Sequence, residues 1–206
     1  MPQADTGLEA RLRRALLTEG ATGSGARAAT TPGAAAAQTA GGVQAAVLVA
    51  LFERKRRLHT VLTRRRDGLR RHPGEISFPG GRRDRGDPDA AAAALREAHE
   101  EIGLAPRSVT VLGELSPTPT IVSGYTVHPI VGLIPDGMSW RLSDAEVAAV
   151  LEPALQDLRA TGGLRTVVRR GLELRTETYL AGEAVIWGVT ARILSDLLGR
   201  LGPLLG

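Results

Sequence analysis

The sequence contains no cysteine, which excludes disulfide bridges, thiolate metal sites and a cysteine nucleophile. This absence is compatible with a reducing cytoplasm, which is the location that we expect. Aromatic residues make up only 3% of the chain, so the core must consist mainly of leucine, valine, isoleucine and alanine. No apolar run approaches the length of a membrane span, and the N-terminus lacks the apolar core of a signal peptide. We therefore expect no membrane association.

Lysine is nearly absent as well, because Lys55 is the only one and the other basic residues are almost all arginine. The formal net charge is +4. A mild positive excess suits a polyanionic small molecule or a nucleic acid, but no basic segment alternates with aromatic residues that could stack on bases. We therefore expect a small-molecule ligand and no nucleic acid, and the sequence leaves a homodimer open.

The chain has 206 residues, which is enough for one domain with a proper core and short for two. Residues 8–17 mix apolar and basic side chains at helical spacing, which predicts a short helix packed on the domain. Residues 18–42 contain little besides alanine, glycine and threonine, which predicts a linker or mobile loop. The sequence thus divides into an N-terminal part, residues 1–42, and a main domain, residues 43–206.

The main domain mixes strand and helix patterns, which is typical of an α/β fold. Apolar runs with β-branched residues predict strands at residues 43–52, 58–63, 109–115 and 126–134, and two more within 164–180. Ser143 is followed by Glu146 at the capping-box position, which predicts a helix over residues 143–151. Pro153 should end that helix or begin a second short one reaching Leu158. Apolar periodicity predicts a closing helix over residues 184–201.

The most informative stretch begins with a tight glycine turn at Gly80 and Gly81, followed by an irregular, charged loop. Asp87 is placed to cap a helix, and Pro88 suits the first helical position because its missing N–H would be unpaired there. The residues that follow are rich in alanine, and Gly103 predicts the end of the helix. The sequence therefore predicts a helix that starts just beyond exposed main-chain amides and carbonyls.

Carboxylates gather on one face of this predicted helix. Glu97, Glu100 and Glu101 are spaced three and four residues apart, so their like charges must be either solvated or neutralised by a cation. Carboxylate oxygens suit a hard ion such as Mg2+, whereas a solvated surface face with Arg96 as a partner is the simpler alternative. The residues expected to pack on the other side are Ala91, Leu95, Ala98 and Ile102.

This stretch resembles the Nudix box, whose pattern is G-x5-E-x7-R-E-U-x-E-E-x-G-U, where U is a bulky apolar residue. The residues that match it in order are Gly81, Arg96, Glu97, Glu100, Glu101, Gly103 and Leu104. Asp87 stands where the pattern has glutamate, eight residues instead of seven separate it from Arg96, and Ala98 is small for the apolar position. The first two departures resemble the branch of the family that acts on coenzyme A.

A second resemblance lies directly upstream and concerns the signature of coenzyme A pyrophosphatases, L-L-T-x-R-S-x-x-L-R-x-H-x-G-Q-x-x-F-P-G-G. The matching residues are Leu62, Thr63, Arg65, Leu69, Arg70, His72, Gly74 and Phe78 through Gly81. Arg66 replaces a small polar residue, and Glu75 puts a carboxylate where the family has an amide. Guanidinium groups bind phosphate bidentately, so Arg65 and Arg70 are the candidate phosphate ligands, with a solvated strand end as the alternative. His72 is expected to be structural.

The resemblance implies the Nudix α/β/α sandwich around a mixed sheet. It implies hydrolysis of coenzyme A or a derivative to 3′,5′-ADP and 4′-phosphopantetheine or its acyl form, with one or more Mg2+ or Mn2+ ions as cofactor. The implied metal ligands are Glu97, Glu100, Glu101 and the Gly81 carbonyl. Arg96 would orient the glutamates, the main chain at Gly80 and Gly81 would contact the substrate, and the general base stays open.

Further options remain open at this point. The SGYTVHPIVGLIP segment also resembles the same enzymes, and its Tyr125 could pack on the substrate or could simply be a core aromatic. Other substrates compatible with a Nudix box are ADP-ribose, another dinucleotide and a nucleoside triphosphate. A member of a different class, a Nudix-fold binding module without turnover, is the remaining alternative.

Overall fold

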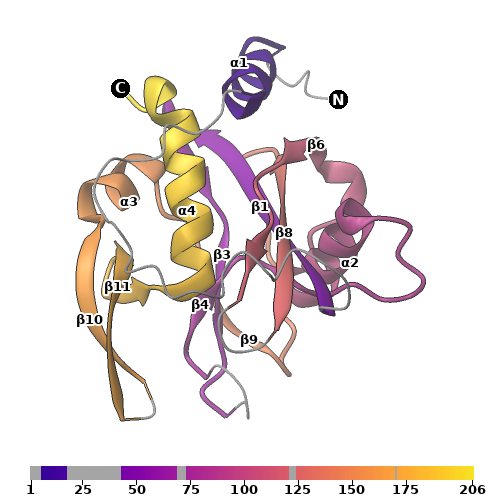
Figure 1. Cartoon of the computed structure of the whole chain (residues 1–206). Coiled ribbons are helices and arrows are strands. Elements are labelled where there is room, and N and C mark those ends of the chain that lie inside the picture. Colours follow the sequence, from indigo (N-terminus) through magenta and orange to yellow (C-terminus); the bar gives the residue numbers. More distant parts are fainter. Residues whose placement is uncertain (1–5, 18–42, 69–72, 121–123, 170) are drawn as a thin grey trace.

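The computed structural model describes residues 6–17, 43–68, 73–120, 124–169 and 171–206. Its helices are α1 (Thr6–Leu17), α2 (Ala90–Ile102), α3 (Leu155–Thr161) and α4 (Gly188–Leu201), with the short 3-10 segments η1 (Pro106–Ser108) and η2 (Gly202–Leu204) (Figure 1). Its strands are β1 (Val43–Arg54), β2 (Arg57–Thr60), β3 (Leu62–Arg65), β4 (Ile76–Ser77), β5 (Gly80–Arg82), β6 (Thr110–Glu114), β7 (Thr118–Pro119), β8 (Tyr125–Leu133), β9 (Val147–Leu151), β10 (Gly163–Arg169), β11 (Leu172–Ala181) and β12 (Ala184–Ile186). Within these ranges, no helix combines the length and the apolar character that crossing a membrane requires.

The central sheet has the strand order β2-β1-β8-β6, with β5 added beside β1 and β7 beside β8. Strands β1 and β8 run parallel from the pair Val43 and Tyr125 to the pair Leu51 and Leu133, whereas the other neighbours are antiparallel. Parallel strands that are covered on both faces read as continuous apolar runs, which explains the uniform apolar character of β1. The strands expected at residues 43–52, 109–115 and 126–134 are therefore confirmed within a residue or two.

Two layers of helices cover this sheet, with α4 and α2 on either side of β1 and β8 (Figure 1). Alternate residues of β1 divide between two apolar clusters, because successive side chains of a strand point to opposite faces. Val49 and Leu51 pack in the cluster that holds α1 and α4. Leu48 and Ala50 pack in the cluster that holds α2. The expected α/β/α sandwich around a mixed sheet is confirmed.

The segment after the central sheet corrects one prediction. Residues 144–146 form a turn and residues 147–151 form β9, so the helix expected from Ser143 to Leu151 is wrong. The main-chain N–H of Val147 does bond to the carbonyl of Ser143, at 3.0 Å, as a first helical turn would require. The chain then pairs with β3 instead of continuing the helix, because the edge of this second sheet, β4-β3-β9, supplies main-chain partners in place of helical ones. The second short helix is confirmed as α3.

The C-terminal part agrees with the two strands expected within residues 164–180, which are β10 and β11. The closing helix begins later than residue 184, because Ala184–Ile186 forms β12 against β11. Gly188 has φ +68°, a left-handed conformation that separates the strand from the helix. The returning strand expected at residues 58–63 is likewise divided into β2 and β3.

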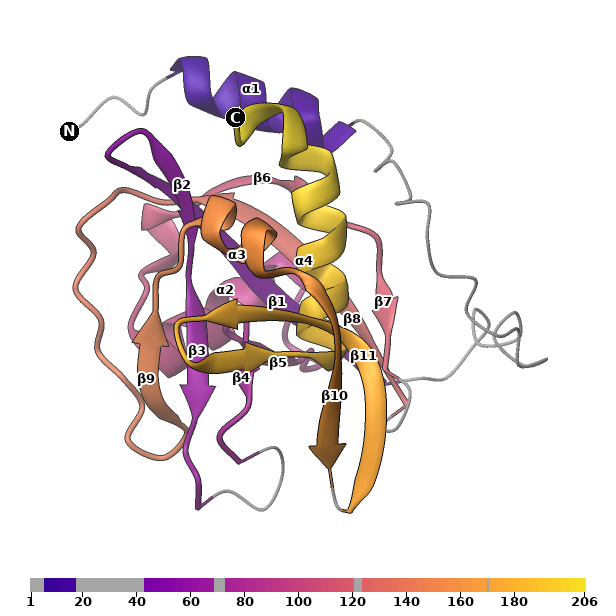
Figure 2. The ribbon, with the colours of Figure 1, turned by 90° about the vertical axis from the view of Figure 1, so that its left-hand side faces the viewer.

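Helix α1 lies across the end of α4 (Figure 2) and packs into the same apolar cluster. Leu12 is fully buried, and Arg13 donates hydrogen bonds of 2.9 Å to the carbonyls of Val111 and Leu112. Arg200 of α4 donates to the carbonyl of Leu16 at 2.8 Å. The expected packing of this helix is confirmed, whereas the linker predicted for residues 18–42 lies outside the described residues.

Candidate active site

Helix α2 is held by a cap at each end. The side chain of Asp89 accepts the N–H of Ala92 at 2.7 Å, so Asp89 is the N-cap and the helix starts at Ala90. The prediction of Asp87 as the cap and Pro88 as the first helical residue is therefore wrong. Gly103 ends the helix with φ +72°, as predicted. The helix starts later because the carboxylate of Asp87 has another partner.

That partner is Arg96, whose guanidinium joins the loop before α2 to the helix itself. Its Nε and Nη2 lie 3.1 and 3.0 Å from the two carboxylate oxygens of Asp87. Its Nη1 lies 2.9 Å from Glu97 and 3.2 Å from Glu100, and Nη2 also donates to the carbonyl of Arg82 at 3.1 Å. These hydrogen bonds lower the pKa of Asp87 and raise that of Arg96. Arg96 thus orients two of the glutamates from one side.

Glu97 lies against the glycine turn. A β-carbon placed on Gly81 would stand only 2.6 Å from the carboxylate of Glu97, so this carboxylate occupies space that any larger residue would take. The side chain of Glu97 is only 18% exposed. Burial raises its pKa, and the hydrogen bond from Arg96 opposes that shift. A larger residue at position 81 would therefore require the carboxylate of Glu97 to move.

Glu101 is the most buried of the glutamates, at 6% exposure, and it accepts the main-chain N–H of Gly80 at 3.3 Å. Burial raises the pKa of Glu101 to about 7, although the Gly80 N–H and the positive charge of Arg65 oppose the shift. A solvated surface face cannot describe such a residue. Glu100, whose side chain is 57% exposed, is the only one of the three glutamates in the box to match that simpler interpretation.

A further charged pair approaches from the second sheet. Arg65 at the end of β3 lies 3.8 Å from the carboxylate of Glu146, and its buried Nε has no hydrogen-bond partner among the described residues. The negative charge of Glu146 raises the pKa values of Glu97 and Glu101. Four glutamates and Asp87 therefore surround two guanidinium groups, and the site carries an excess of negative charge.

Sequence reasoning explained Glu146 as part of a capping box and so missed it as a site residue. The turn that carries it is attached to the end of α2, because the N–H of Ser143 donates to the carbonyl of Glu101 at 2.8 Å. A β-bulge between Arg64 and Arg65 shifts the pairing register of β3 and β9 next to this turn. The one signal for Glu146 in the sequence was its carboxylate. Local sequence patterns could not place this residue in the site, because its position depends on the pairing of β9 with the distant strand β3.

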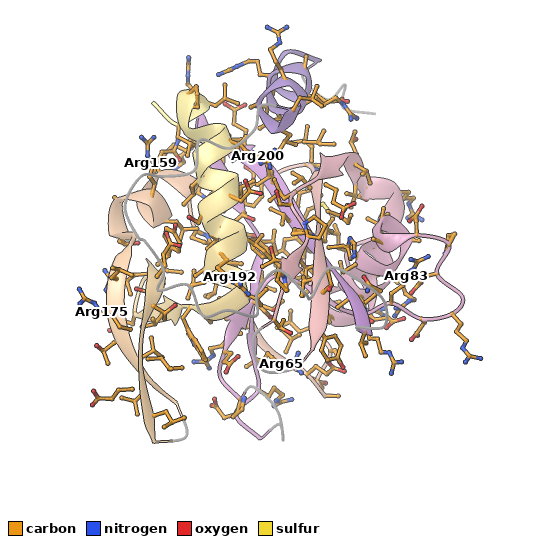
Figure 3. All side chains as sticks on the ribbon, viewed as in Figure 1. Arg65, Arg83, Arg159, Arg175, Arg192 and Arg200 are labelled. Atoms are coloured by element: carbon orange, nitrogen blue, oxygen red, sulfur yellow. The ribbon has the colours of Figure 1, made fainter. Side chains whose placement is uncertain are left out.

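Other residues expected in the site are placed differently. Tyr125 begins β8 and packs, partly buried, against the cluster on the α1 and α4 face, which is the position of a core aromatic. The cluster of α2 lies on the other face. Arg70 and His72 lie outside the described residues. Figure 3 shows Arg65 near one end of the sheet and Arg83 on the side that carries the loop before α2.

The carboxylates fit a hard divalent cation by their chemistry. In the described part of the chain, no group of three acidic or histidine side chains converges closely enough to hold a metal, because Glu97 and Glu100 face Arg96 while Glu101 faces Gly80. The donors are all oxygens, which suit a hard cation. Burial, and to a smaller extent the neighbouring carboxylates, raise the pKa values of Glu97 and Glu101, and a bound divalent cation would favour their charged forms.

Comparison with known proteins agrees with this chemistry. A family model described as NUDIX domain matches residues 42–161. Over 161 residues, the chain is 38% identical to the uncharacterized Nudix hydrolase NudL of Enterobacter sp. (strain 638). The aligned region covers 77% of this chain and 83% of the relative. The NudL of Salmonella paratyphi B is 40% identical with the same coverage. The structure of a MutT/nudix family protein from Enterococcus faecalis shares the fold, with a TM-score of 0.53 and 16% identity over 81% of this chain and 64% of that one.

Proposed function

Because this chain belongs to the Nudix hydrolase family and hydrolyses phosphorus anhydrides, with nucleoside diphosphate derivatives as its substrate class, we propose that its substrate is coenzyme A or an acyl derivative. The products are 3′,5′-ADP and 4′-phosphopantetheine or its acyl form. One observation carries this proposal, namely the coenzyme A-type signature that ends at the glycine turn. The described part of this signature forms β3, β4 and β5, which bring Arg65 and Gly80 next to Glu101.

We propose that Glu97, Glu100, Glu101 and the Gly81 carbonyl hold the Mg2+ or Mn2+ that Nudix hydrolases use. When bound, the ion neutralises charge on the diphosphate and activates a water molecule. Arg96 holds Glu97 and Glu100 at hydrogen-bonding distance and links them to Asp87, so the glutamates keep one orientation. A β-carbon on Gly80 would stand 2.3 Å from the carbonyl oxygen of Ala46, and one on Gly81 would stand 2.6 Å from Glu97, so the two glycines let the turn pack closely against β1 and α2.

Arg65 is the side chain that we assign to the diphosphate. Its Nε is buried and lacks an acceptor within the described residues, which is a costly arrangement that a bound phosphate oxygen would relieve. Its positive charge already acts on Glu101. The role of Arg70 and the substrate contact of Tyr125 stay predictions.

The test is a substrate comparison with product identification. Purified protein is incubated with coenzyme A, ADP-ribose and dATP, each with and without Mg2+, and products are identified by mass. We expect metal-dependent release of 3′,5′-ADP from coenzyme A. The Glu97→Gln/Glu101→Gln double variant, prepared in the same way, measures any contaminating hydrolase. Much faster turnover of ADP-ribose or dATP would overturn the coenzyme A assignment and leave the hydrolase class intact.

A cytoplasmic location and the absence of association with nucleic acid or membranes stay predictions, and whether the protein forms a homodimer stays an open question. Sedimentation of the purified protein alone measures its oligomeric state. Sedimentation with duplex DNA and with lipid vesicles measures association with nucleic acid and membranes. Fractionation of the source cells tests the cytoplasmic location.

A further inference from the structure

An open pocket of about 410 Å³ lies beside the glycine turn. It is lined by the start of β1 and by residues 82–85 and 87 of the loop before α2. Successive residues of a strand point to opposite sides, and position 81 faces Glu97. Arg82 therefore points away from Glu97. The pocket and the carboxylate site lie on opposite sides of β5. In the described part of the chain, β5 pairs only with β1, so its other edge is unpaired.

The pocket carries an excess of positive charge. Arg82, Arg83 and Arg85 line it, and none of them forms an ion pair with a carboxylate among the described residues. The two acidic residues of the lining face Arg96 instead, which lies 3.0 Å from Asp87 and 3.9 Å from Asp84. Arg82 and Arg85 are exposed. An anion could therefore bind here without displacing an existing ion pair.

The loop that presents these arginines is braced at several points. The guanidinium of Arg83 donates to the carbonyls of Asp87 and Pro88 at 3.2 and 2.7 Å, and its main-chain N–H donates to the carbonyl of Gln44 at 2.9 Å. The N–H of Asp84 donates to the carboxylate of Asp87 at 2.8 Å. A frame that is already ordered reduces the entropy cost of binding a ligand. Arg83 thus holds the loop, and the guanidinium groups of Arg82 and Arg85 are left for a ligand.

We propose that Arg82 and Arg85 bind the phosphate monoester that the substrate carries on its ribose, in the pocket beside β5. This inference rests on the proposed function, because a substrate with a 5′-diphosphate and a 3′-phosphate on the same ribose needs two anion sites close together. Arg65 and the metal site take the diphosphate, and the braced loop takes the second phosphate across the edge of β5. Guanidinium groups suit this role because they bind phosphate oxygens in pairs.

The experiment compares two ligand pairs that differ only in this phosphate. Hydrolysis of coenzyme A and of dephospho-coenzyme A is measured for the wild type and for the Arg82→Ala/Arg85→Ala variant. Binding of 3′,5′-ADP and of 5′-AMP is measured by calorimetry, which needs no turnover. The control variant, Arg14→Ala/Arg107→Ala, removes the same charge from exposed arginines on α1 and η1.

We expect the loop variant to lose roughly 10- to 100-fold in kcat/KM on coenzyme A, mainly through KM, and far less on dephospho-coenzyme A. The wild type should bind 3′,5′-ADP more tightly than 5′-AMP, and the loop variant should bind the two equally. The control variant should keep the wild-type preference in both the hydrolysis and the binding comparison. Equal losses on both ligands of a pair, or no loss, would overturn the pocket assignment. If the wild type binds 3′,5′-ADP more tightly through these arginines but does not cleave coenzyme A, the pocket assignment stands and the proposed function fails.

Discussion

The carboxylate of Glu97 lies where a side chain at Gly81 would begin, since a β-carbon at that position would stand 2.6 Å from its Oε2. This close approach joins the glycine turn to α2, and from it we infer that a side chain at position 81 would disturb the proposed metal site. We expect Gly81→Ala to displace Glu97 and to lower kcat by about 100-fold, as misplacement of a reacting group does. Steady-state kinetics at saturating Mg2+ measures the loss.

A matched control for this variant is Gly113→Ala in β6, where an added β-carbon meets no atom within 4 Å and the backbone is not left-handed. We expect normal turnover there. Both variants should keep the wild-type circular dichroism. Normal activity of Gly81→Ala would mean that Glu97 can move aside without cost.

The glutamates of the box should behave as metal ligands. Glutamine keeps the size of glutamate and removes its charge, so each of Glu97→Gln, Glu100→Gln and Glu101→Gln should weaken the metal site. We expect the variants at positions 100 and 101 to be strongly impaired, by about 10²–10⁴-fold for a residue that also transfers a proton. Raising the Mg2+ concentration should partly rescue a ligand variant and should not rescue the loss of a general base.

The comparison for this series is Glu183→Gln, which removes an exposed carboxylate in the turn between β11 and β12. Rates are measured at limiting Mg2+, where ligand losses are largest. Near-normal rates in all of the box variants under that condition would mean that the glutamates form a solvated surface and do not hold a metal.

The raised pKa of Glu101 predicts how the stability of the metal-free protein depends on pH. Folding favours the protonated form, so this contribution is complete below the ordinary pKa of 4.5 and is lost as pH rises through about 7. Glu101→Gln resembles the protonated form at every pH. We therefore expect it to raise the free energy of unfolding at pH 8 by about 1–3 kcal/mol and to change little near pH 4.

Urea unfolding in EDTA at the two pH values checks this difference. Glu100→Gln, which removes an exposed carboxylate from the same helix, should show a much smaller effect. Added Mg2+ should stabilise the wild type more than the Glu101→Gln variant, because a ligand that binds only the folded state adds to stability. A wild type that is more stable than Glu101→Gln at pH 8 in EDTA would contradict the burial argument.

The link between Asp87 and Arg96 should stabilise the fold. Arg96 lowers the pKa of Asp87, so the stabilisation is present above the ordinary pKa of 3.8 and is lost as pH falls below it. We expect Asp87→Asn to cost about 1.5–3 kcal/mol at pH 7, the usual range for a hydrogen bond to a charged group, and less at pH 3. Asp84→Asn in the same loop is the comparison, because that carboxylate is 69% exposed and lies 3.9 Å from Arg96. Equal costs for the two variants would exclude a special role for Asp87.

Helix α1 should contribute to stability through its buried face. Leu12 is fully buried and Leu17 is 86% exposed on the same helix, so the two leucines form a matched pair. We expect Leu12→Ala to lower the free energy of unfolding by about 2–5 kcal/mol and Leu17→Ala to have little effect. Chemical denaturation followed by fluorescence or circular dichroism measures both. A negligible effect of Leu12→Ala would show that α1 separates from the domain in solution.

Local signals in the sequence located the parts of the site that depend on local geometry. The placement of Glu97, Glu100 and Glu101 on one helix, the end of that helix at Gly103 and the continuous apolar run of β1 are such features, and the structure agrees with each. The helix cap shows the limit of this reasoning. Asp87 and Asp89 both suit a cap by type, and the ion pair with Arg96 decides between them.

Contacts between distant segments could not be predicted in the same way. The burial of Glu101 depends on how closely β5 approaches α2, and the position of Glu146 depends on the pairing of β9 with β3. The capping-box pattern at Ser143 favoured a helix because it describes only the first turn. Tertiary pairing overrides that preference, which is a weak one for a segment this short.

The parallel pairing of β1 with β8 also bears on how the protein is made. Val43 must find Tyr125 across the entire intervening chain, and closing such a loop is entropically costly and slow. Arg65, the glycine turn and all of α2 lie inside that loop. A nascent chain that ends before β8 therefore carries the glutamate helix without the strand that completes its packing surface. The turn at residues 144–146 is made later still, and only then can the N–H of Ser143 donate to the carbonyl of Glu101 at the end of α2.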